Sequence, residues 1–422
     1  MKSLKWFVIS LLWVSTSFAI EPEFIGYLRG GTGINLEGGK NNCFYNQGIP
    51  GNFMRLGNEC EFYTELGITF PHKKADEQDT SYFKTHFRLV AKSPGVRQWE
   101  SATNSIAQQL EAFITVGGLN EIPGEIWIGK RFYRDADSHI MDWFYYADMS
   151  GVGAGIDNLS VGTGKLAVAH LIQGNDDPAI TTDNGTPVNQ FLDIRYKSVP
   201  VMEDQNINFW AVYGFGQEST DGATEYADRS GFVLATRLNG PLYTGNNNFA
   251  VLYGTGLMRD FNIYGSSTLP VAQDHLNDAW TVRVVDDWVR DVTDKWAVMF
   301  TAAIEHSDSG ADTNSIRQMQ IIGVRPTYYV TDRFQMVFDA GFSRVNDESE
   351  GAAFENRDLS RFTIAPQISF KKSVWGRPVM RFYVAHSTWS ESNKSKVAVG
   401  PAAAFADKTS GTNVGYQFET WF

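Results

Sequence analysis

The last ten residues, Asn413 to Phe422, constrain the fold most strongly. They have the sequence N-V-G-Y-Q-F-E-T-W-F. Successive side chains of a strand point to opposite faces, so Gln417, Glu419 and Trp421 share one face, and Tyr, Phe, Thr and Phe alternate on the other. An acid and an amide on one face and aromatics on the other fit a strand between lipid and a water-filled interior. The segment therefore predicts one strand of a transmembrane antiparallel β-barrel.

Similar alternation occurs near the N-terminus. Residues 23–31 are expected to form a strand with Tyr27 and Arg29 on one face. Residues 55–66 are expected to form the next strand, with Glu61, Tyr63 and Glu65 on the same face. Residues 81–90 place Lys, His and Arg opposite Phe and Leu. A charged face opposite an apolar one is unusual in a soluble sheet and indicates a wet lumen.

The C-terminal third predicts regularly spaced strands. Short connections at 330–332 and 371–378 alternate with long polar ones at 306–315 and 346–360. Short turns at one end and long loops at the other are typical of outer-membrane barrels. The expected strands are 296–304, 319–329, 333–342, 361–370 and 379–386.

Residues 1–19 have the features of a secretory signal peptide. Two lysines precede an apolar run, and the small-x-small sequence Ser17-Phe18-Ala19 is a cleavage site. Beyond residue 20 no stretch approaches the roughly 18 apolar residues of a spanning helix. No Pro-rich or Ser-rich linker divides residues 20–422, so we expect a single barrel domain there.

Net charge and cysteine content limit the kinds of ligand and partner expected for this chain. The net charge is -12, near -14 without the two signal lysines, which argues against nucleic acid. Cys43 and Cys60 are the only cysteines. An exported chain meets an oxidising compartment, so we expect a disulfide that pins an exposed loop. Two thiolates without a nearby His are a poor zinc set, and no metal or cofactor is expected.

The segment from Arg134 to Asp148 is dense in acids and aromatics without clean alternation. It is too polar for a core and too aromatic for a plain surface loop, so we expect a loop folded into an aqueous interior. The pair Asp135-x-Asp137 lacks the acids and glycine that complete an EF-hand. Asp135, Asp137 and Asp142 could supply paired acids to a secreted glycosidase or glycan-binding β-sandwich, but the alternation at both termini disfavours that alternative.

With these segments in view, the chain resembles the maltoporins, the sugar-specific porins of the Gram-negative outer membrane. The resemblance runs from the start of the mature chain to the last residue. The matching stretches are G-Y-L-R at 26–29, R-L-G-N-E-C-E-F-Y-T-E-L at 55–66, I-W-I-G-K-R-F-Y at 126–133, D-S-H-I-M-D at 137–142, S-G-V-G-A-G at 150–155, W-G-R-P at 375–378 and the terminal Q-F-E-T-W-F.

The resemblance implies an eighteen-stranded barrel, a homotrimer and a lumen lined by an aromatic path, the greasy slide, beside charged residues. The loop around 130–148 would be the inward-folded constriction. In the family, the residue matching Trp99 reaches into a neighbouring subunit. The slide maps onto Tyr27, Tyr63, Trp99, Trp375 and Trp421. The polar track and constriction map onto Arg29, Arg55, Glu65, Asp137, His139, Asp142 and Phe144.

Three positions depart from the family pattern. An expected arginine falls near Leu110, and a slide phenylalanine falls near Asn246, with Phe249 and Tyr243 as possible substitutes. The constriction tyrosine falls on Phe144 or Tyr145, and parity with Asp142 favours Phe144.

The expected function is therefore a passive channel for maltose and maltodextrins, not an enzyme. Its partners would be the oligosaccharide, outer-membrane lipid and two further copies of the chain, with a periplasmic sugar-binding protein considered downstream. The alternatives are a porin for another oligosaccharide, such as sucrose or a β-glucoside, and a general diffusion porin.

Overall fold

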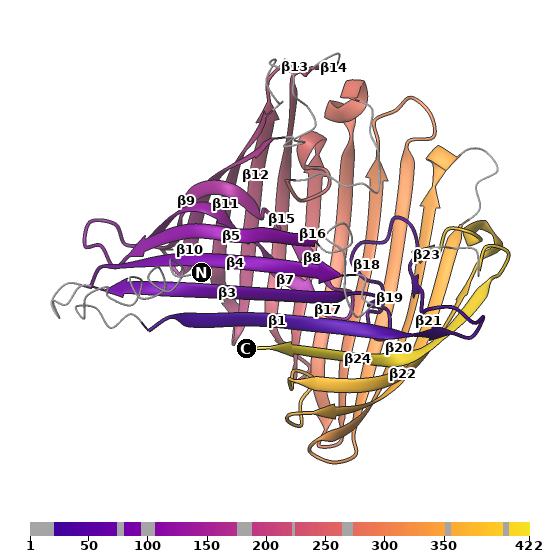
Figure 1. The fold of residues 1–422 in the computed structure, drawn as a ribbon. Coiled ribbons are helices and arrows are strands. Elements are labelled where there is room, and N and C mark those ends of the chain that lie inside the picture. The colour runs from indigo at the N-terminus through magenta and orange to yellow at the C-terminus, as the bar shows by residue number, and fades with distance from the viewer. Residues whose placement is uncertain are drawn as a thin grey trace, which may run out of the picture.

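The computed structural model describes residues 21–73, 80–93, 106–174, 188–221, 224–263, 273–350, 356–399 and 405–422. Eighteen antiparallel strands form one closed barrel (Figure 1). The first nine are β1 (Glu23–Asn35), β3 (Phe62–Lys73), β4 (Tyr82–Ser93), β5 (Ile106–Gly117), β6 (Glu125–Arg131), β9 (Gly151–Val161), β10 (Gly164–Gly174), β11 (Val188–Met202) and β12 (Gln205–Gly216). The remaining nine are β15 (Arg229–Leu242), β16 (Gly245–Thr255), β17 (Trp280–Thr293), β18 (Trp296–Asp308), β19 (Ile316–Tyr329), β20 (Phe334–Asp347), β21 (Arg357–Ser369), β22 (Val379–Trp389) and β24 (Ser410–Trp421).

The barrel closes where the last strand meets the first. Strand β24 pairs antiparallel with β1, and Tyr27 lies opposite Trp421 while Arg29 lies opposite Glu419. Strand β1 also pairs with β3, and β9 with β10, so each barrel strand has two neighbours. Among the described residues, no helix is long and apolar enough to span a membrane.

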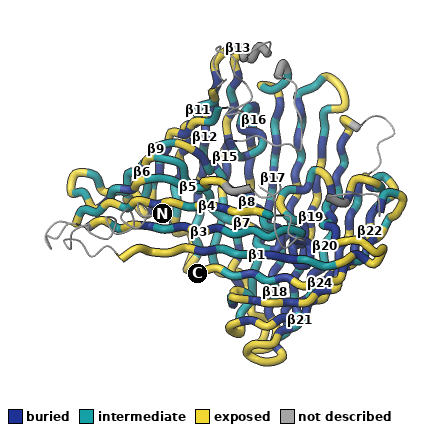
Figure 2. Tube along the Cα trace, viewed as in Figure 1, coloured by how far each residue is buried: buried dark blue, intermediate teal, exposed yellow. Residues whose placement is uncertain are grey.

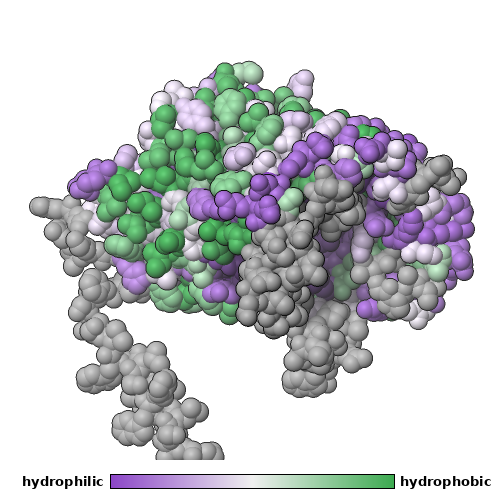
Figure 3. All heavy atoms as spheres, turned by 90° about the horizontal axis from the view of Figure 1, so that it is seen from above, coloured by the Kyte–Doolittle hydropathy of each residue, from purple (hydrophilic) through white to green (hydrophobic). Residues whose placement is uncertain are grey.

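The wall has an apolar outer face and a polar inner face. On β24, Gln417 and Glu419 are buried inside, whereas Tyr416 is 59% exposed on the outside. On β4, His86 is buried inside while Phe83 is 51% exposed outside. Figure 2 shows this alternation along the strands, and Figure 3 shows apolar side chains gathered over a broad area of the face it presents. The predicted alternation is confirmed at both termini.

The connections also alternate in length. Two-residue turns join β9 to β10, β11 to β12 and β17 to β18, whereas residues 256–279 join β16 to β17. Short turns are periplasmic and long loops extracellular in such barrels. The five C-terminal strands were predicted in the right places, although most of them extend further than expected. The expected signal peptide lies outside the described residues and stays a prediction.

The loop between β1 and β3, residues 36–61, differs from expectation in two ways. The strand predicted from Arg55 begins only at Phe62, so Arg55 belongs to the loop. The disulfide between Cys43 and Cys60 is confirmed, with the Cα atoms 5.9 Å apart, but it does not pin an exposed loop. The side chains of Phe53 and Met54 are fully buried inside the barrel.

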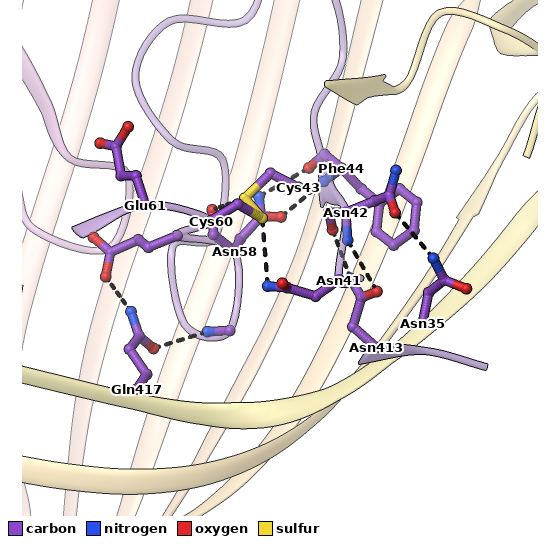
Figure 4. The surroundings of a disulfide bond; sticks show 12 residues. Asn35, Asn41, Asn42, Cys43, Phe44, Asn58, Cys60, Glu61, Asn413 and Gln417 are labelled. Atoms are coloured by element: carbon purple, nitrogen blue, oxygen red, sulfur yellow. Dashed lines mark hydrogen bonds between the residues drawn. A yellow bond between two sulfur atoms is a disulfide. The ribbon is translucent and has the colours of Figure 1, made fainter. Parts of the chain in front are cut away.

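Hydrogen bonds tie this loop to the inner wall. Arg361 on β21 donates to the carbonyl oxygens of Met54 at 3.2 Å and Leu56 at 3.1 Å. Near the disulfide, the Asn413 side chain of β24 donates to the Asn42 carbonyl at 2.6 Å (Figure 4). Within the loop, β2 (Cys43–Phe44) pairs with β23 (Ala398–Val399) of the last long loop. The expectation of an exposed loop is wrong because the loop's polar groups bond to the wall and its apolar residues Phe53 and Met54 fill the interior.

A second loop, between β6 and β9, also folds inward, as predicted. It forms a hairpin of β7 (Asp135–Ser138) and β8 (Trp143–Tyr146). The Ser138 hydroxyl lies 2.7 Å from the Thr301 hydroxyl on β18, and the Tyr146 hydroxyl donates to the Asn208 carbonyl on β12 at 3.2 Å. Its other side contacts the first loop, where the Arg55 amide donates to the Ile140 carbonyl at 3.0 Å. The hairpin therefore bridges the lumen.

Close packing against β20 leads to a prediction. A Cβ added at Gly341 would lie 2.5 Å from Met54 Cγ and 3.1 Å from Phe53 Cζ. Gly341→Val should therefore push the first loop off the wall and destabilise the barrel by about 1–3 kcal/mol. The midpoint of heat-induced unfolding in detergent should fall. The control, Ala340→Val, adds its bulk to the outer face of the same strand and should leave the midpoint unchanged; equal effects would contradict this packing.

Candidate functional site

The two inward loops and the strands at the barrel closure enclose a cavity of about 470 Å³, which we call the upper cavity. Its aromatic side chains come from β1, β3, β24 and the hairpin, and its charged ones from both loops and the wall. Ten of the twelve residues expected from the sequence line it. They are Tyr27, Arg29, Arg55, Tyr63, Glu65, Asp137, His139, Asp142, Phe144 and Trp421, joined by Arg134.

The alternation of side chains along β1 and β3 explains which residues of the wall line the upper cavity. Tyr27 on β1 and Tyr63 on β3 point inward, and their ring centroids lie 6.0 Å apart in an edge-to-face arrangement. The guanidinium of Arg29 lies 5.0 Å from the centroid of Tyr63. The Tyr63 hydroxyl donates to Glu65 at 2.6 Å. Aromatic surface and charged groups therefore alternate along the same inner face.

Arg29 connects the wall to both loops. Its guanidinium pairs with Glu59 at 2.9 Å and Glu61 at 3.0 Å, and it also contacts Asp142 at the hairpin tip. Although burial alone would raise the pKa of Asp142, Arg55 and Arg29 hold that pKa below its ordinary value. Asp142 therefore stays ionised at neutral pH, and the pair holds the tip against the wall.

Glu419 is the most heavily paired carboxylate of the site. It pairs with Arg55 at 2.8 Å, Arg377 at 2.6 Å and Arg381 at 3.5 Å, and it accepts a hydrogen bond from Tyr27 at 3.0 Å. Its side chain is almost completely buried. One carboxylate thus orients the lining tyrosine and three arginines.

His139 lies between the terminal strand and a periplasmic turn. Its ring centroid is 6.0 Å from that of Trp421 and 5.2 Å from that of Trp375. Arg377 contacts its Nε2 at 3.1 Å and also lies 4.0 Å from the Trp421 centroid. Burial lowers the pKa of His139 well below its ordinary value, against the opposing attraction of Glu419. The imidazole is therefore neutral and serves as a third ring between two tryptophans.

The hairpin presents Phe144 to the upper cavity, whereas Tyr145 is buried and packs against Trp143. This agrees with the parity argument for Phe144. Arg134 lies between two rings, 3.6 Å from the centroid of Phe144 and 3.9 Å from that of Phe132. Such cation–π contacts fix the guanidinium at the cavity edge.

Two expected residues lie elsewhere. Trp99 falls outside the described residues. Trp375, in the turn between β21 and β22, lines a second cavity of about 220 Å³, which we call the lower cavity. Phe249 and Tyr243, suggested as replacements for a missing slide ring, do not line either cavity. The Phe249 side chain is 41% exposed on the outer wall, and Tyr243 is 80% exposed in a turn.

Sequence reasoning missed three residues that form ion pairs at the site, Glu59, Arg377 and Glu419, and it missed Arg134, which lies between two rings. Glu419 was recognisable, since its parity with Gln417 and Trp421 already placed it inside. The sequence indicated Arg134 less clearly: it follows Phe132 by two residues and begins the loop that was expected to fold inward. Glu59 shares the parity of Glu61 and Glu65 in the strand expected over residues 55–66, so it was recognisable as well, whereas Arg377 belongs to a turn, for which period-2 alternation gives no direction.

A closed antiparallel barrel with an apolar outer wall, a charged interior and two inward loops defines an outer-membrane porin. More specifically, the chain belongs to the LamB porin family, whose model, described as LamB porin, matches residues 22–422. It is thus a sugar-specific porin of the outer membrane and not an enzyme, and the resemblance to the maltoporins is confirmed.

Similar solved structures include OmpT, an outer membrane protein of Vibrio cholerae. The outer-membrane expressed form is 10% identical, with a TM-score of 0.42 over 96% of this chain and 100% of that chain. The in-vitro folded trimer form is also 10% identical, with a TM-score of 0.41 over the same shares of the two chains.

The pairing of Glu419 leads to a prediction. Glu419→Gln keeps the shape of the side chain but leaves three buried arginines without their shared carboxylate. Removing one partner of a buried pair costs about 3–5 kcal/mol, so the barrel should unfold at clearly lower guanidinium concentration. The matched change Glu121→Gln, at an exposed position between β5 and β6, should have no effect. An unchanged midpoint for Glu419→Gln would mean that water in the lumen replaces the pairing.

Proposed function

We propose that this chain conducts maltose and maltodextrins passively across the outer membrane, along an aromatic slide flanked by charged residues. The observation that carries the proposal is the lining of the upper cavity. Three rings of the wall, from Tyr27, Tyr63 and Trp421, share one enclosed space with arginines and carboxylates.

The chemistry of a pyranose matches this lining. Its C–H faces can lie against aromatic rings, and its hydroxyl groups exchange hydrogen bonds with ionised side chains. In this proposal Arg29, Arg55, Glu65, Asp137 and Asp142 contact the hydroxyls. Phe144, on the hairpin that bridges the lumen, narrows the path.

The charges of the lining residues support moderate, not tight, binding of a sugar. Burial and the neighbouring Asp142 raise the pKa of Asp137, whereas the arginines lower that of Asp142. Most of the arginines are already paired with protein carboxylates, so a sugar gains only part of their hydrogen-bonding capacity. Conduction needs binding that favours entry but still permits release.

This proposal predicts a saturable block of ion current by maltotriose. Trp421→Ala and Tyr63→Ala each remove a stacking surface and should raise the half-saturating sugar concentration by roughly 3- to 10-fold. Planar-bilayer conductance measures the block. The control Trp296→Ala removes a ring from the outer wall, where Trp296 packs on Tyr328, and should leave the block unchanged.

The alternatives give different results in the same measurement. A general diffusion porin would carry current that maltotriose does not interrupt. A porin for another oligosaccharide would be blocked by sucrose or a β-glucoside at lower concentration than by maltotriose. A sugar panel on the parent protein therefore separates the three.

We further propose that the working unit is a homotrimer in which Trp99 of one subunit reaches into the neighbouring pore. Membership of the porin family supports this, as does the apolar outer face of β22 and β24, where Phe382 is 69% exposed beside Tyr416. Sedimentation of the detergent-solubilised protein should give the mass of three chains. A monomeric mass in mild detergents would contradict the assembly but not the channel.

A further inference from the structure

Arg134 lines the upper cavity and, among the described residues, has no carboxylate partner for its guanidinium. The other lining arginines are already paired, Arg29 with Glu59 at 2.9 Å and Arg55 with Glu419 at 2.8 Å. No described group accepts a hydrogen bond from the Arg134 side chain either. A guanidinium carries five N–H donors and stays positively charged at physiological pH. The described lining therefore presents a cation that is free to bind a ligand.

Two phenyl rings hold this guanidinium in place. Its central carbon lies 3.6 Å from the ring centroid of Phe144 on β8 and 3.9 Å from that of Phe132. Phe132 is itself anchored to the wall, because its amide donates to Glu111 on β5 at 2.8 Å and the guanidinium of Arg88 lies 5.2 Å from its ring. A guanidinium stacked on aromatic rings uses its faces and leaves its in-plane N–H groups available. The donors are therefore preorganised at the edge of the cavity.

The acids of the same cavity leave Arg134 available. Asp142 pairs with Arg29, and Glu65 pairs with an arginine of β4 at 3.1 Å. Asp137, three residues after Arg134, pairs with no cation among the described residues. Burial and the neighbouring Asp142 raise the pKa of Asp137, so it stays protonated to a higher pH than a free aspartate. Less negative charge therefore lies beside the guanidinium than three fully ionised carboxylates would give.

These features favour a single carboxylate as the ligand of Arg134. A guanidinium binds a carboxylate through two parallel N–H···O bonds, each roughly twice as strong as a neutral hydrogen bond. A sugar hydroxyl offers neither the charge nor the matching pair of oxygens. A phosphate monoester would bring about two negative charges into a cavity that already holds Glu65, Asp137 and Asp142, so a singly charged group fits better.

We propose that Arg134 forms a carboxylate-binding site in the upper cavity, through which the channel also takes acidic saccharides that contain a uronate or an aldonate. The inference rests on the proposed sugar channel and extends its substrates from neutral maltodextrins to singly charged sugars. The aromatic rings contact the pyranose units as they do in a neutral sugar, while Arg134 pairs with the carboxylate. The attraction is local, because the chain carries a net charge of -12 and repels anions at longer range.

The test compares conductance block by maltose and by maltobionate, in which the reducing end of maltose is oxidised to a carboxylate. Arg134→Gln keeps hydrogen-bonding groups but removes the charge, so half-saturation by maltobionate should rise about 10-fold, and half-saturation by maltose less than about 3-fold. In the parent, raising the salt from about 0.1 M to about 1 M should weaken the maltobionate block more than the maltose block. The matched control Lys130→Gln removes a cation from the outer face of β6, which it shares with Ile128, and should alter neither value.

A second variant guards against a general loss of structure. Arg134→Lys keeps the charge but loses the planar fork of donors, so its maltobionate block should lie between those of the parent and Arg134→Gln. If Arg134→Gln weakens both blocks equally, or weakens neither, the carboxylate site is wrong, although the sugar channel would stand. If maltobionate blocks the parent through Arg134 and maltose does not block it, the proposed function fails and the site stands. If neither sugar blocks the parent, both fail.

Discussion

The structure depends on one constraint: inside a bilayer, each backbone N–H and C=O must find a partner within the protein. An open sheet would leave two edges exposed to hydrocarbon, so the pairing of β24 with β1 is indispensable. That pairing also brings residues nearly four hundred positions apart into contact. Tyr27 and Arg29 meet Glu419 and Trp421 at this closure, and the upper cavity forms there.

Closure creates an interior that must itself be organised. Alternate residues of every strand point inward, and the wall alone would leave a wide polar lumen. The two inward loops fill much of it, with apolar residues such as Met54 and Ile140 packed where they meet. Because charged groups at such depth are costly unless paired, the arginines at the closure share carboxylates from both loops and the wall. The same ion pairs that hold the loops therefore shape the upper cavity.

Much of this could be predicted from the sequence, and the reason is geometric. Period-2 alternation fixes the direction of a strand side chain, so alternation alone assigns Tyr63, Glu65 and Trp421 to the lumen. The same rule gives no direction for a loop. Arg55 was predicted in a strand, yet it reaches the site because its loop turns inward. Arg377, in a turn, was missed for the same reason. The loop held by the disulfide was expected to be exposed, whereas its polar groups bond to the inner wall.

The division of the path into two cavities follows from the same architecture. The hairpin crosses the lumen and carries His139, whose depressed pKa keeps it an uncharged ring between Trp421 and Trp375. The lining of the upper cavity combines aromatics with arginines and carboxylates, whereas the described lining of the lower cavity combines an indole with two amides and lacks a cation. The two linings therefore offer different partners to a polar solute: the upper cavity presents guanidinium groups beside carboxylates, whereas the lower one presents neutral amides beside Asp137 and Asp287. Because Asp137 and His139 line both cavities, the hairpin that crosses the lumen produces this division.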